Sequence, residues 1–100
     1  MRSGGYVYIM TNFTNTVLYT GVTSSIARRV YKHKEALYPK SFTTRYACTK
    51  LVWFQYFQRI EDAIDEEKRI KAGSRQKKID RINKINPHWE DLWESVQEWL

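Results

Sequence analysis

Residues 6–23 read YVYIMTNFTNTVLYTGVT, two runs rich in β-branched and aromatic residues on either side of a run of turn-forming residues. The flanking runs, residues 6–10 and 17–23, have the composition of strands, and the Thr and Asn residues between them favour a short connection. The pattern therefore predicts an antiparallel hairpin. If its turn is centred between Phe13 and Thr14, Tyr8 lies opposite Tyr19 and the two side chains share one face of the sheet.

The rest of the chain adds one strand and several helices. Residues 51–57 have the composition of a third strand, and residues 26–37, 60–72 and 74–86 have helical periodicity. Gly73 ends the second of these helices, Ser74 caps the third, and Pro87 stops it. This order predicts an α+β fold in which a small three-stranded antiparallel sheet is flanked by helices.

The last residues form a separate pattern. Residues 89–100 carry apolar side chains at helical spacing, which predicts an acidic amphipathic helix packed on the domain formed by residues 1–88; these side chains are Trp89, Leu92, Trp93, Val96, Trp99 and Leu100. Burial of each large aromatic side chain is worth about 1.5–3 kcal/mol, so this face is expected to be covered.

Composition narrows the class of protein. One hundred residues are expected to form one domain. Cys48 is the only cysteine, which excludes an internal disulfide and a cysteine-based zinc cluster. No run approaches the about 20 apolar residues that span a bilayer, and the first ten residues do not resemble a signal peptide. We therefore expect a cytoplasmic monomer that does not enter the membrane.

The charge is unevenly distributed. The chain has a net charge of +6, yet residues 87–100 contain four acidic residues and no Lys or Arg. The first 86 residues therefore carry a net charge of +10. Such a basic body attracts polyanions, nucleic acid above all. Charge alone is equally compatible with a basic protein that binds no nucleic acid.

Two basic side chains lie close to the apolar face of the first helix. Arg29 and His33 are four residues apart and therefore adjacent on the helix surface, near the stripe formed by Ile26 and Val30. Arg is rarely buried without a partner. One interpretation is structural: Arg29 extends past the core to solvent, and His33 is a hydrogen-bonded core residue. The other is that both line a functional pocket.

The helix predicted over residues 60–72 carries a carboxylate on its apolar stripe. Glu67 lies at the centre of that stripe, whereas four other acidic residues point away from it, as a solvated face would: Glu61, Asp62, Asp65 and Glu66. A core-facing carboxylate costs free energy unless it is paired or binds a metal. Glu67 is therefore a candidate metal ligand, and its structural alternative is an ion pair with Arg29 or a neighbouring Lys.

In their order and spacing, these residues resemble the GIY-YIG nuclease superfamily. The triplet at residues 6–8 resembles the GIY element, and the triplet at residues 19–21 resembles YIG. Arg29 and His33 follow at the family's spacing, and Glu67 matches the position of its metal-binding carboxylate. The segments LYTGVT, RxxxHK, FTxRY and NPxWxDL are similar to those of the small single-domain bacterial YhbQ-like group. Tyr6 and Thr20 depart from the GIY and YIG triplets without altering Tyr8, Tyr19 or Gly21.

The resemblance implies a metal-dependent endonuclease that hydrolyses phosphodiester bonds. Glu67 would hold Mg²⁺ or Mn²⁺, and Arg29 would bind phosphate oxygens. Tyr8, Tyr19 and His33 would transfer protons or position water, and the resemblance favours Tyr8 as the group that acts on the water. Gly21 and Asn86 match supporting positions of the family.

Substrate binding is expected on basic residues outside this set, namely Arg45, Lys71, Arg75, Lys77 and Lys78, although each is also compatible with a solvated face. No appended nucleic-acid-binding module accompanies the domain, so we expect structure-guided binding, of DNA rather than RNA, or recruitment by a protein partner. Repair and recombination are the processes in which such an activity would serve. Two alternatives stay open: a non-catalytic nucleic-acid-binding module with the nuclease fold, and a protein-interaction domain that uses the Trp-rich C-terminal helix.

Overall fold

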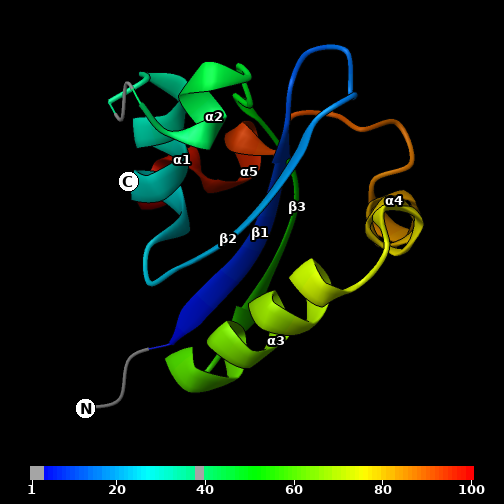
Figure 1. Ribbon diagram of the computed structural model, residues 1–100. Helices are drawn as coiled ribbons and strands as arrows, with labels where there is room; N and C mark the ends of the chain where they lie inside the picture. Colours follow the sequence, from blue (N-terminus) through cyan, green and yellow to red (C-terminus); the bar gives the residue numbers. More distant parts are fainter. Residues whose placement is uncertain (1–3, 38–39) are drawn as a thin grey trace.

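The computed structural model describes residues 4–37 and 40–100. Its centre is a three-stranded antiparallel sheet with strand order β2-β1-β3, made of β1 (Gly5–Thr11), β2 (Leu18–Thr23) and β3 (Lys50–Phe57). Helices cover both faces of the sheet (Figure 1). The predicted α+β fold with a three-stranded antiparallel sheet is confirmed.

Five helices and one 3-10 turn accompany the sheet in the described part of the chain: α1 (Ile26–Lys34), α2 (Phe42–Arg45), α3 (Ile60–Ala72), α4 (Arg75–Ile85), α5 (Trp93–Val96) and η1 (Gln97–Trp99). Gly73 ends α3, and the Ser74 hydroxyl accepts a hydrogen bond from the Lys77 amide at 3.2 Å to cap α4, both as predicted. Helix α1 is shorter than predicted because Ala36 adopts a positive φ of 53°. Helix α2 was not predicted.

The hairpin register differs from the prediction. Tyr8 pairs with Gly21, and Tyr19 pairs with Met10. The turn is therefore centred one residue later than predicted, between Thr14 and Asn15. The Asn12 side chain causes this shift, because its Oδ1 accepts hydrogen bonds from the amides of Thr16 at 2.8 Å and Val17 at 3.0 Å. The side-chain amide thus closes a longer loop than the turn residues alone indicate. Tyr8 and Tyr19 still share one face as diagonal neighbours, with ring centroids 6.2 Å apart.

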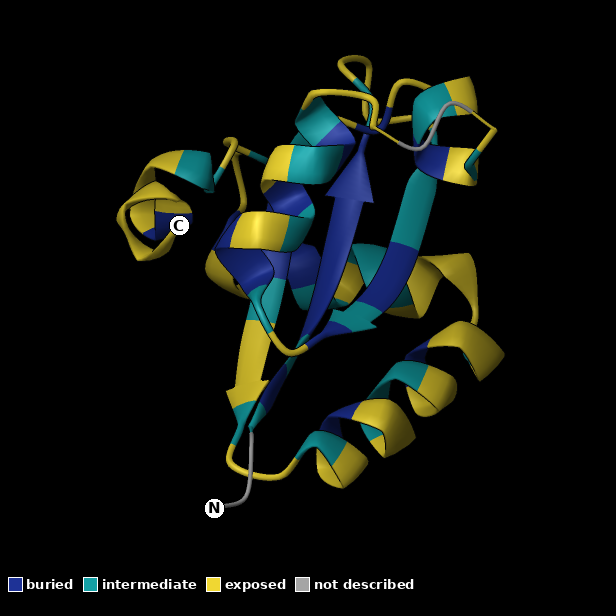
Figure 2. Cartoon of the chain, turned by 90° about the vertical axis from the view of Figure 1, so that its left-hand side faces the viewer, coloured by how far each residue is buried: buried dark blue, intermediate teal, exposed yellow. Residues whose placement is uncertain are grey.

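Two apolar cores lie on opposite faces of the sheet. On one face, Val7 and Ile9 pack with Ala63 and Ile70 of α3. On the other, alternate residues of β1 pack with side chains of α1 and α5: Tyr8, Met10, Ile26, Val30 and Val96. Strand β1 is buried between these layers (Figure 2). This strand therefore fixes which side chains face α1 and which face α3.

The C-terminal segment is not the single helix predicted over residues 89–100. Trp89 has a positive φ of 54°, and helix begins only at Trp93. The reason is that Asn86 and Asp91 hold the intervening residues in an irregular, non-helical path. The Asn86 Nδ2 donates to the carbonyls of Val52 and Glu90, both at 2.9 Å, and the Asp91 Oδ1 accepts from the Leu51 amide at 3.1 Å. The segment still packs on the domain, since Val96 is fully buried.

Across residues 4–37 and 40–100, every helix is too short or too polar to traverse a lipid bilayer.

Candidate active site

His33 is the centre of a buried hydrogen-bond network that joins three elements. Its Nε2 lies 3.1 Å from the Tyr8 Oη on β1, and its Nδ1 lies 2.8 Å from the Thr43 Oγ1 on α2. His33 and Thr43 are both buried, at 4% and 1% exposure. One ring nitrogen donates and the other accepts, so the two hydroxyl partners together fix the orientation of a neutral imidazole.

The surroundings of His33 disfavour its protonation. Burial and, to a smaller extent, the positive charge of Arg29 together lower the pKa of His33 from 6.5 to about 4. Arg29 lies one turn earlier on α1, on the same side of the helix. At neutral pH the imidazole is therefore uncharged and able to accept a proton.

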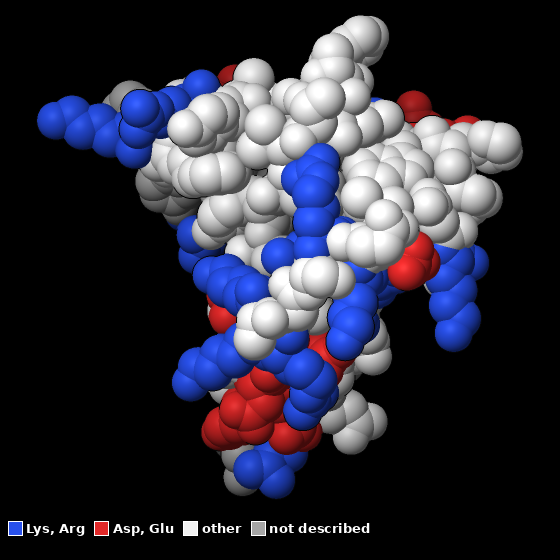
Figure 3. All heavy atoms as spheres, turned by 45° about the vertical axis from the view of Figure 1, so that its right-hand side comes forward, with Lys and Arg blue, Asp and Glu red and all other residues white. Residues whose placement is uncertain are grey.

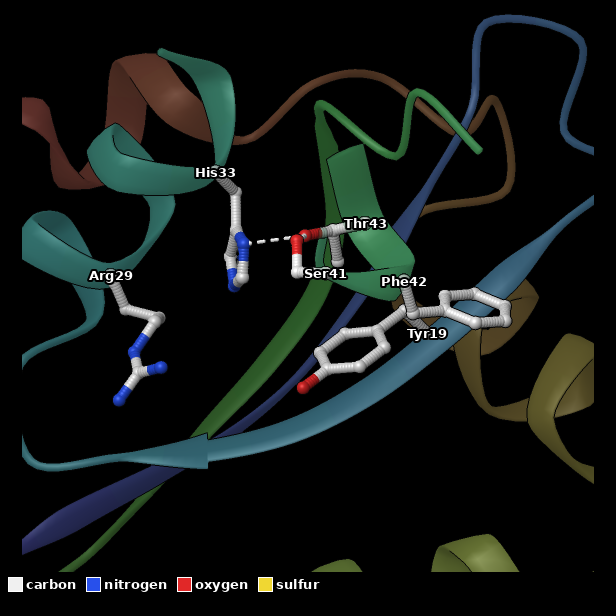
Figure 4. A pocket seen from close by; sticks show the side chains of 6 residues that line it. All are labelled: Tyr19, Arg29, His33, Ser41, Phe42 and Thr43. Carbon is white, nitrogen blue, oxygen red and sulfur yellow. Dashed lines mark hydrogen bonds between the residues drawn. The ribbon is translucent and has the colours of Figure 1, made fainter. Parts of the chain in front are cut away.

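A hollow of about 250 Å³ opens beside this network and is lined by Tyr19, Arg29, His33, Ser41, Phe42 and Thr43. Figure 4 shows the Tyr19 hydroxyl and the Arg29 guanidinium pointing into it from β2 and α1. No carboxylate is among the described residues that line the hollow. The hollow thus offers a cation, a phenol and an imidazole to a bound anion.

Tyr8 stands behind the hollow and does not line it. Its side chain is 1% exposed, whereas Tyr19 is half-buried. Gly21 makes room for the Tyr8 ring, because a Cβ added at Gly21 would lie 2.5 Å from both Cζ and Oη of Tyr8. The predicted supporting role of Gly21 thus has a steric basis in the structure.

Glu67 comes from the other side of the sheet. It lies on α3, which packs against the Val7 and Ile9 face, and it is absent from the described lining of the hollow. Its Oε2 forms an ion pair with the Lys71 Nζ at 2.9 Å, and its side chain is 14% exposed. The neighbouring Lys, one of the two partners expected for an ion pair, is therefore present.

The prediction that Glu66 faces solvent is wrong. Its side chain is only 12% exposed and contacts two guanidinium groups, that of Arg69 and, at 3.1 Å, that of Arg81. The reason is that Arg81, on α4, reaches Glu66 from a second helix, which a helical wheel of α3 alone does not include. Glu66 therefore joins α3 to α4.

The described residues contain no group of three or more His, Cys, Asp or Glu side chains close enough to hold a metal ion. Mg²⁺ needs less than that, because it usually keeps several waters and takes one or two carboxylates together with substrate phosphate oxygens. Glu67 could serve as such a single carboxylate ligand if its ion pair with Lys71 is broken.

Comparison with known proteins supplies the family. Residues 4–83 match the GIY-YIG catalytic domain. The chain belongs to the GIY-YIG family. It is 33% identical over 85 residues, or 85% of its length and 95% of the relative's, to a UPF0213 protein of Syntrophus aciditrophicus. The solution NMR structure of a UPF0213 protein from Bacillus halodurans is similar with a TM-score of 0.56 and 28% identity, over 88% of this chain and 92% of the other.

Nucleic acid is the substrate that the GIY-YIG domain implies, and Lys and Arg side chains are spread over the face of the domain that Figure 3 shows. Lys71 and Lys78 line a second hollow together with Tyr19, and Lys77 and Lys78 line a third with Arg69 and Arg81. Arg45 lies over the Tyr46 ring, 5.7 Å from its centroid.

Arg75 was predicted to bind the substrate and Asn86 to support the site, and the side chains of both form hydrogen bonds within the fold. Arg75 donates to the Thr16 carbonyl at 2.8 Å and so holds the hairpin loop against α4. Asn86 is buried, and its side chain forms hydrogen bonds with backbone groups of β3 and of the C-terminal segment. Both therefore stabilise the fold around the GIY-YIG site.

Three residues of α2 and its N-cap line the hollow beside His33 but were not predicted as site residues: Ser41, Phe42 and Thr43. A signal was present in the sequence, since residues 40–46 read KSFTTRY and place two aromatic residues among polar and basic ones. Only the fold brings this segment beside His33.

Proposed function

We propose that this GIY-YIG protein is a divalent-metal-dependent endonuclease that hydrolyses phosphodiester bonds, in DNA rather than RNA, during repair or recombination. The observation that carries the proposal is the buried, neutral His33, hydrogen-bonded to Tyr8 and open to a hollow that also contains Arg29 and Tyr19. A purely structural histidine needs no cation beside it, and the charge of Arg29 disfavours its protonation.

Arg29 is assigned to the phosphate. Its planar guanidinium can donate two parallel hydrogen bonds to phosphate oxygens, and its charge stabilises the additional negative charge of the transition state.

Tyr19 is assigned to the reacting water or leaving oxygen, in place of Tyr8. The hydroxyl of Tyr19 faces the hollow, whereas Tyr8 is 1% exposed and contacts His33. A phenol of ordinary pKa near 10 is a poor base, so its proton needs an acceptor. Tyr8 then acts as a positioning residue that orients His33. A proton from Tyr19 would reach the neutral imidazole through one of the hydroxyls that occupy its two nitrogens, those of Tyr8 and Thr43.

Glu67 is assigned to the metal, with Lys71 displaced from its carboxylate. A bound Mg²⁺ or Mn²⁺ would supply Lewis-acid stabilisation of phosphoryl or leaving-group oxygens. Lys71 supports the idea that α3 lies near the first hollow. It forms the ion pair with Glu67, and it lines the second hollow together with Tyr19. The residues of α3 and those of the first hollow would thus meet around the edge of β2.

Cleavage of labelled branched, flapped, duplex and single-stranded DNA and RNA, with Mg²⁺, Mn²⁺ or a chelator, tests the proposal. Arg29→Ala should lower the cleavage rate by about 100-fold. Arg28→Ala is the matched control, because Arg28 is the adjacent residue of α1 but is exposed and does not line the hollow. Equal rates for the two variants would contradict the assignment of Arg29.

Glu67→Gln should raise the Mn²⁺ concentration needed for half-maximal cleavage by about 10-fold or more. Asp65→Asn, an exposed position of the same helix, should leave it unchanged. A wild-type protein that binds these substrates and cleaves none would indicate a non-catalytic binding module.

A further inference from the structure

A row of three aromatic rings crosses the mouth of the hollow. The Tyr19 and Phe42 rings are stacked, with centroids 5.9 Å apart and planes inclined by 29°. Tyr46 extends the row, with its centroid 4.7 Å from that of Phe42. Phe42 and Tyr46 are 45% and 43% exposed, which is a large solvent exposure for aromatic side chains.

Two of these rings, Tyr19 and Phe42, are shared by two hollows. Tyr19 and Phe42 line the hollow that contains Arg29 and His33, and the same two rings line a second hollow of about 260 Å³. The other lining residues of the second hollow are Leu18, Thr20, Lys71 and Lys78. A chain that passed from one hollow to the other would therefore cross the face or edge of Phe42.

The charges on this path suit a polyanion. Among the described residues, neither hollow is lined by an Asp or Glu, while Arg29 lies in one and Lys71 and Lys78 lie in the other. Lys71 is paired with Glu67, which moderates its charge. Lys78 also lines the third hollow, beside Arg69, Lys77 and Arg81, so the cations continue away from the ring row. Figure 3 shows basic side chains across the middle of one face, with acidic ones among and below them.

Cations together with exposed rings distinguish single strands from duplexes. Phosphates of either form are attracted to Lys and Arg, but only an unpaired base presents its face for stacking on an aromatic side chain. A duplex buries those faces within its own stack. A ring at the boundary between two basic hollows therefore gains binding energy only from an unpaired nucleotide.

We propose that Phe42, flanked by Tyr19 and Tyr46, is a base-stacking platform, and that the substrate strand is single-stranded where it crosses from the Lys71 and Lys78 hollow into the Arg29 hollow. This inference rests on the proposed function for the reaction that follows and adds the substrate class: nucleic acid with an unpaired segment, such as a flap or a single strand.

Fluorescence anisotropy with a labelled single-stranded DNA and the matching duplex, in a chelator, tests the platform by binding alone. Phe42→Leu keeps an apolar side chain but removes the ring, and should weaken single-strand binding by about 5-fold or more with less than about 2-fold effect on the duplex. Phe42→Trp should retain single-strand binding. Phe13→Leu is the control, since Phe13 is 91% exposed on the hairpin loop and should have no effect.

Two results would overturn the platform: Phe42→Leu that binds the single strand as tightly as wild type, or that loses single strand and duplex equally. Tyr46→Leu provides a second variant, expected to weaken only single-strand binding, and circular dichroism verifies that each variant is folded. The binding assay contains no divalent ion and therefore does not depend on cleavage. If single-strand binding depends on the Phe42 ring but the protein cleaves no substrate when Mg²⁺ or Mn²⁺ is added, only the proposed nuclease function is refuted. Arg29-dependent cleavage without a Phe42 effect would refute the platform alone.

Discussion

His33 connects three elements through its two ring nitrogens, and its protonation state decides whether that connection survives. The Tyr8 and Thr43 hydroxyls satisfy a neutral ring, in which one nitrogen donates and the other accepts. A protonated ring has two donors and a charge, and it would lie beside Arg29 in a buried position. The neutral form is thus the one that the fold selects.

The stability of the protein should fall as the pH drops from about 6.5 towards 4. The unfolded chain binds a proton at His33 near pH 6.5, whereas the pKa of His33 in the folded protein is about 4. Between these values only the unfolded state is protonated, so the free energy of unfolding should decrease by at most about 1.4 kcal/mol per pH unit through this group. Above pH 6.5 this contribution is complete and constant.

Urea unfolding at pH 7, 6 and 5 measures this dependence. In His33→Gln, the free energy of unfolding should decrease less steeply with falling pH, because the contribution of one titrating proton is removed. His88→Gln, at the exposed second histidine, is the control and should keep the wild-type slope. Identical slopes for wild type and His33→Gln would show that His33 titrates normally in the folded protein.

At the scale of elements, the pairing of β1 with β2 sets the geometry of the site. Placing Gly21 opposite Tyr8 leaves space for the phenol to lie across β2 and reach His33. The same register places Tyr19 two residues away on the same face, where its hydroxyl reaches the hollow. A shift of β2 by one residue relative to β1 would turn Tyr19 to the α3 face and away from Tyr8.

Gly21→Ala should therefore destabilise the protein by about 1–3 kcal/mol and displace Tyr8, since the new Cβ would lie 2.5 Å from the phenol. Gly73→Ala is the matched control, because its nearest contact would be 3.4 Å and its φ of −79° suits any residue. Urea unfolding of both variants measures the difference. A Gly21→Ala protein as stable as wild type would mean that the Tyr8 ring moves without cost.

For the whole molecule, the C-terminal segment binds the two cores together. Trp89 packs against the core beneath α3, whereas Leu92, Trp93 and Val96 pack against the core beneath α1. Asp91 lies between them and accepts hydrogen bonds from the Leu51 amide and from Lys34, the latter at 2.5 Å. The four acidic residues of the segment are thus carried on a structural element.

Deletion of residues 89–100 should abolish the folded state. Removing these apolar side chains costs about 1.5–3 kcal/mol for each well-buried one, which together approaches the 5–15 kcal/mol that roughly spans the total stability of a domain. Deletion of residues 97–100 is the control and should leave the fold intact, because Trp99 and Leu100 are 52% and 63% exposed. Circular dichroism and thermal unfolding distinguish the two. A folded 89–100 deletion that binds DNA more tightly at low salt would instead make the acidic segment a regulator.

The strands, the main helices and most residues on their inward faces could be predicted from the sequence alone. These features are local, since they depend on side-chain periodicity, on Ser74 as a cap and on Gly73 as a stop. The same local patterns singled out Tyr8, Tyr19, Arg29 and His33, which the fold brings together from β1, β2 and α1.

Features that depend on contacts between distant segments could not be predicted without the fold. The Asn12 side chain sets the hairpin register, Arg81 covers Glu66 from another helix, and Asn86 with Asp91 holds residues 89–92 out of a helix. Each is a side-chain contact whose partner a periodic pattern does not identify. The same holds for Phe42, whose place between two basic hollows follows from the packing of α2 beside β2. Helical and strand periods report the face a residue occupies, and packing alone determines which side chain meets it there.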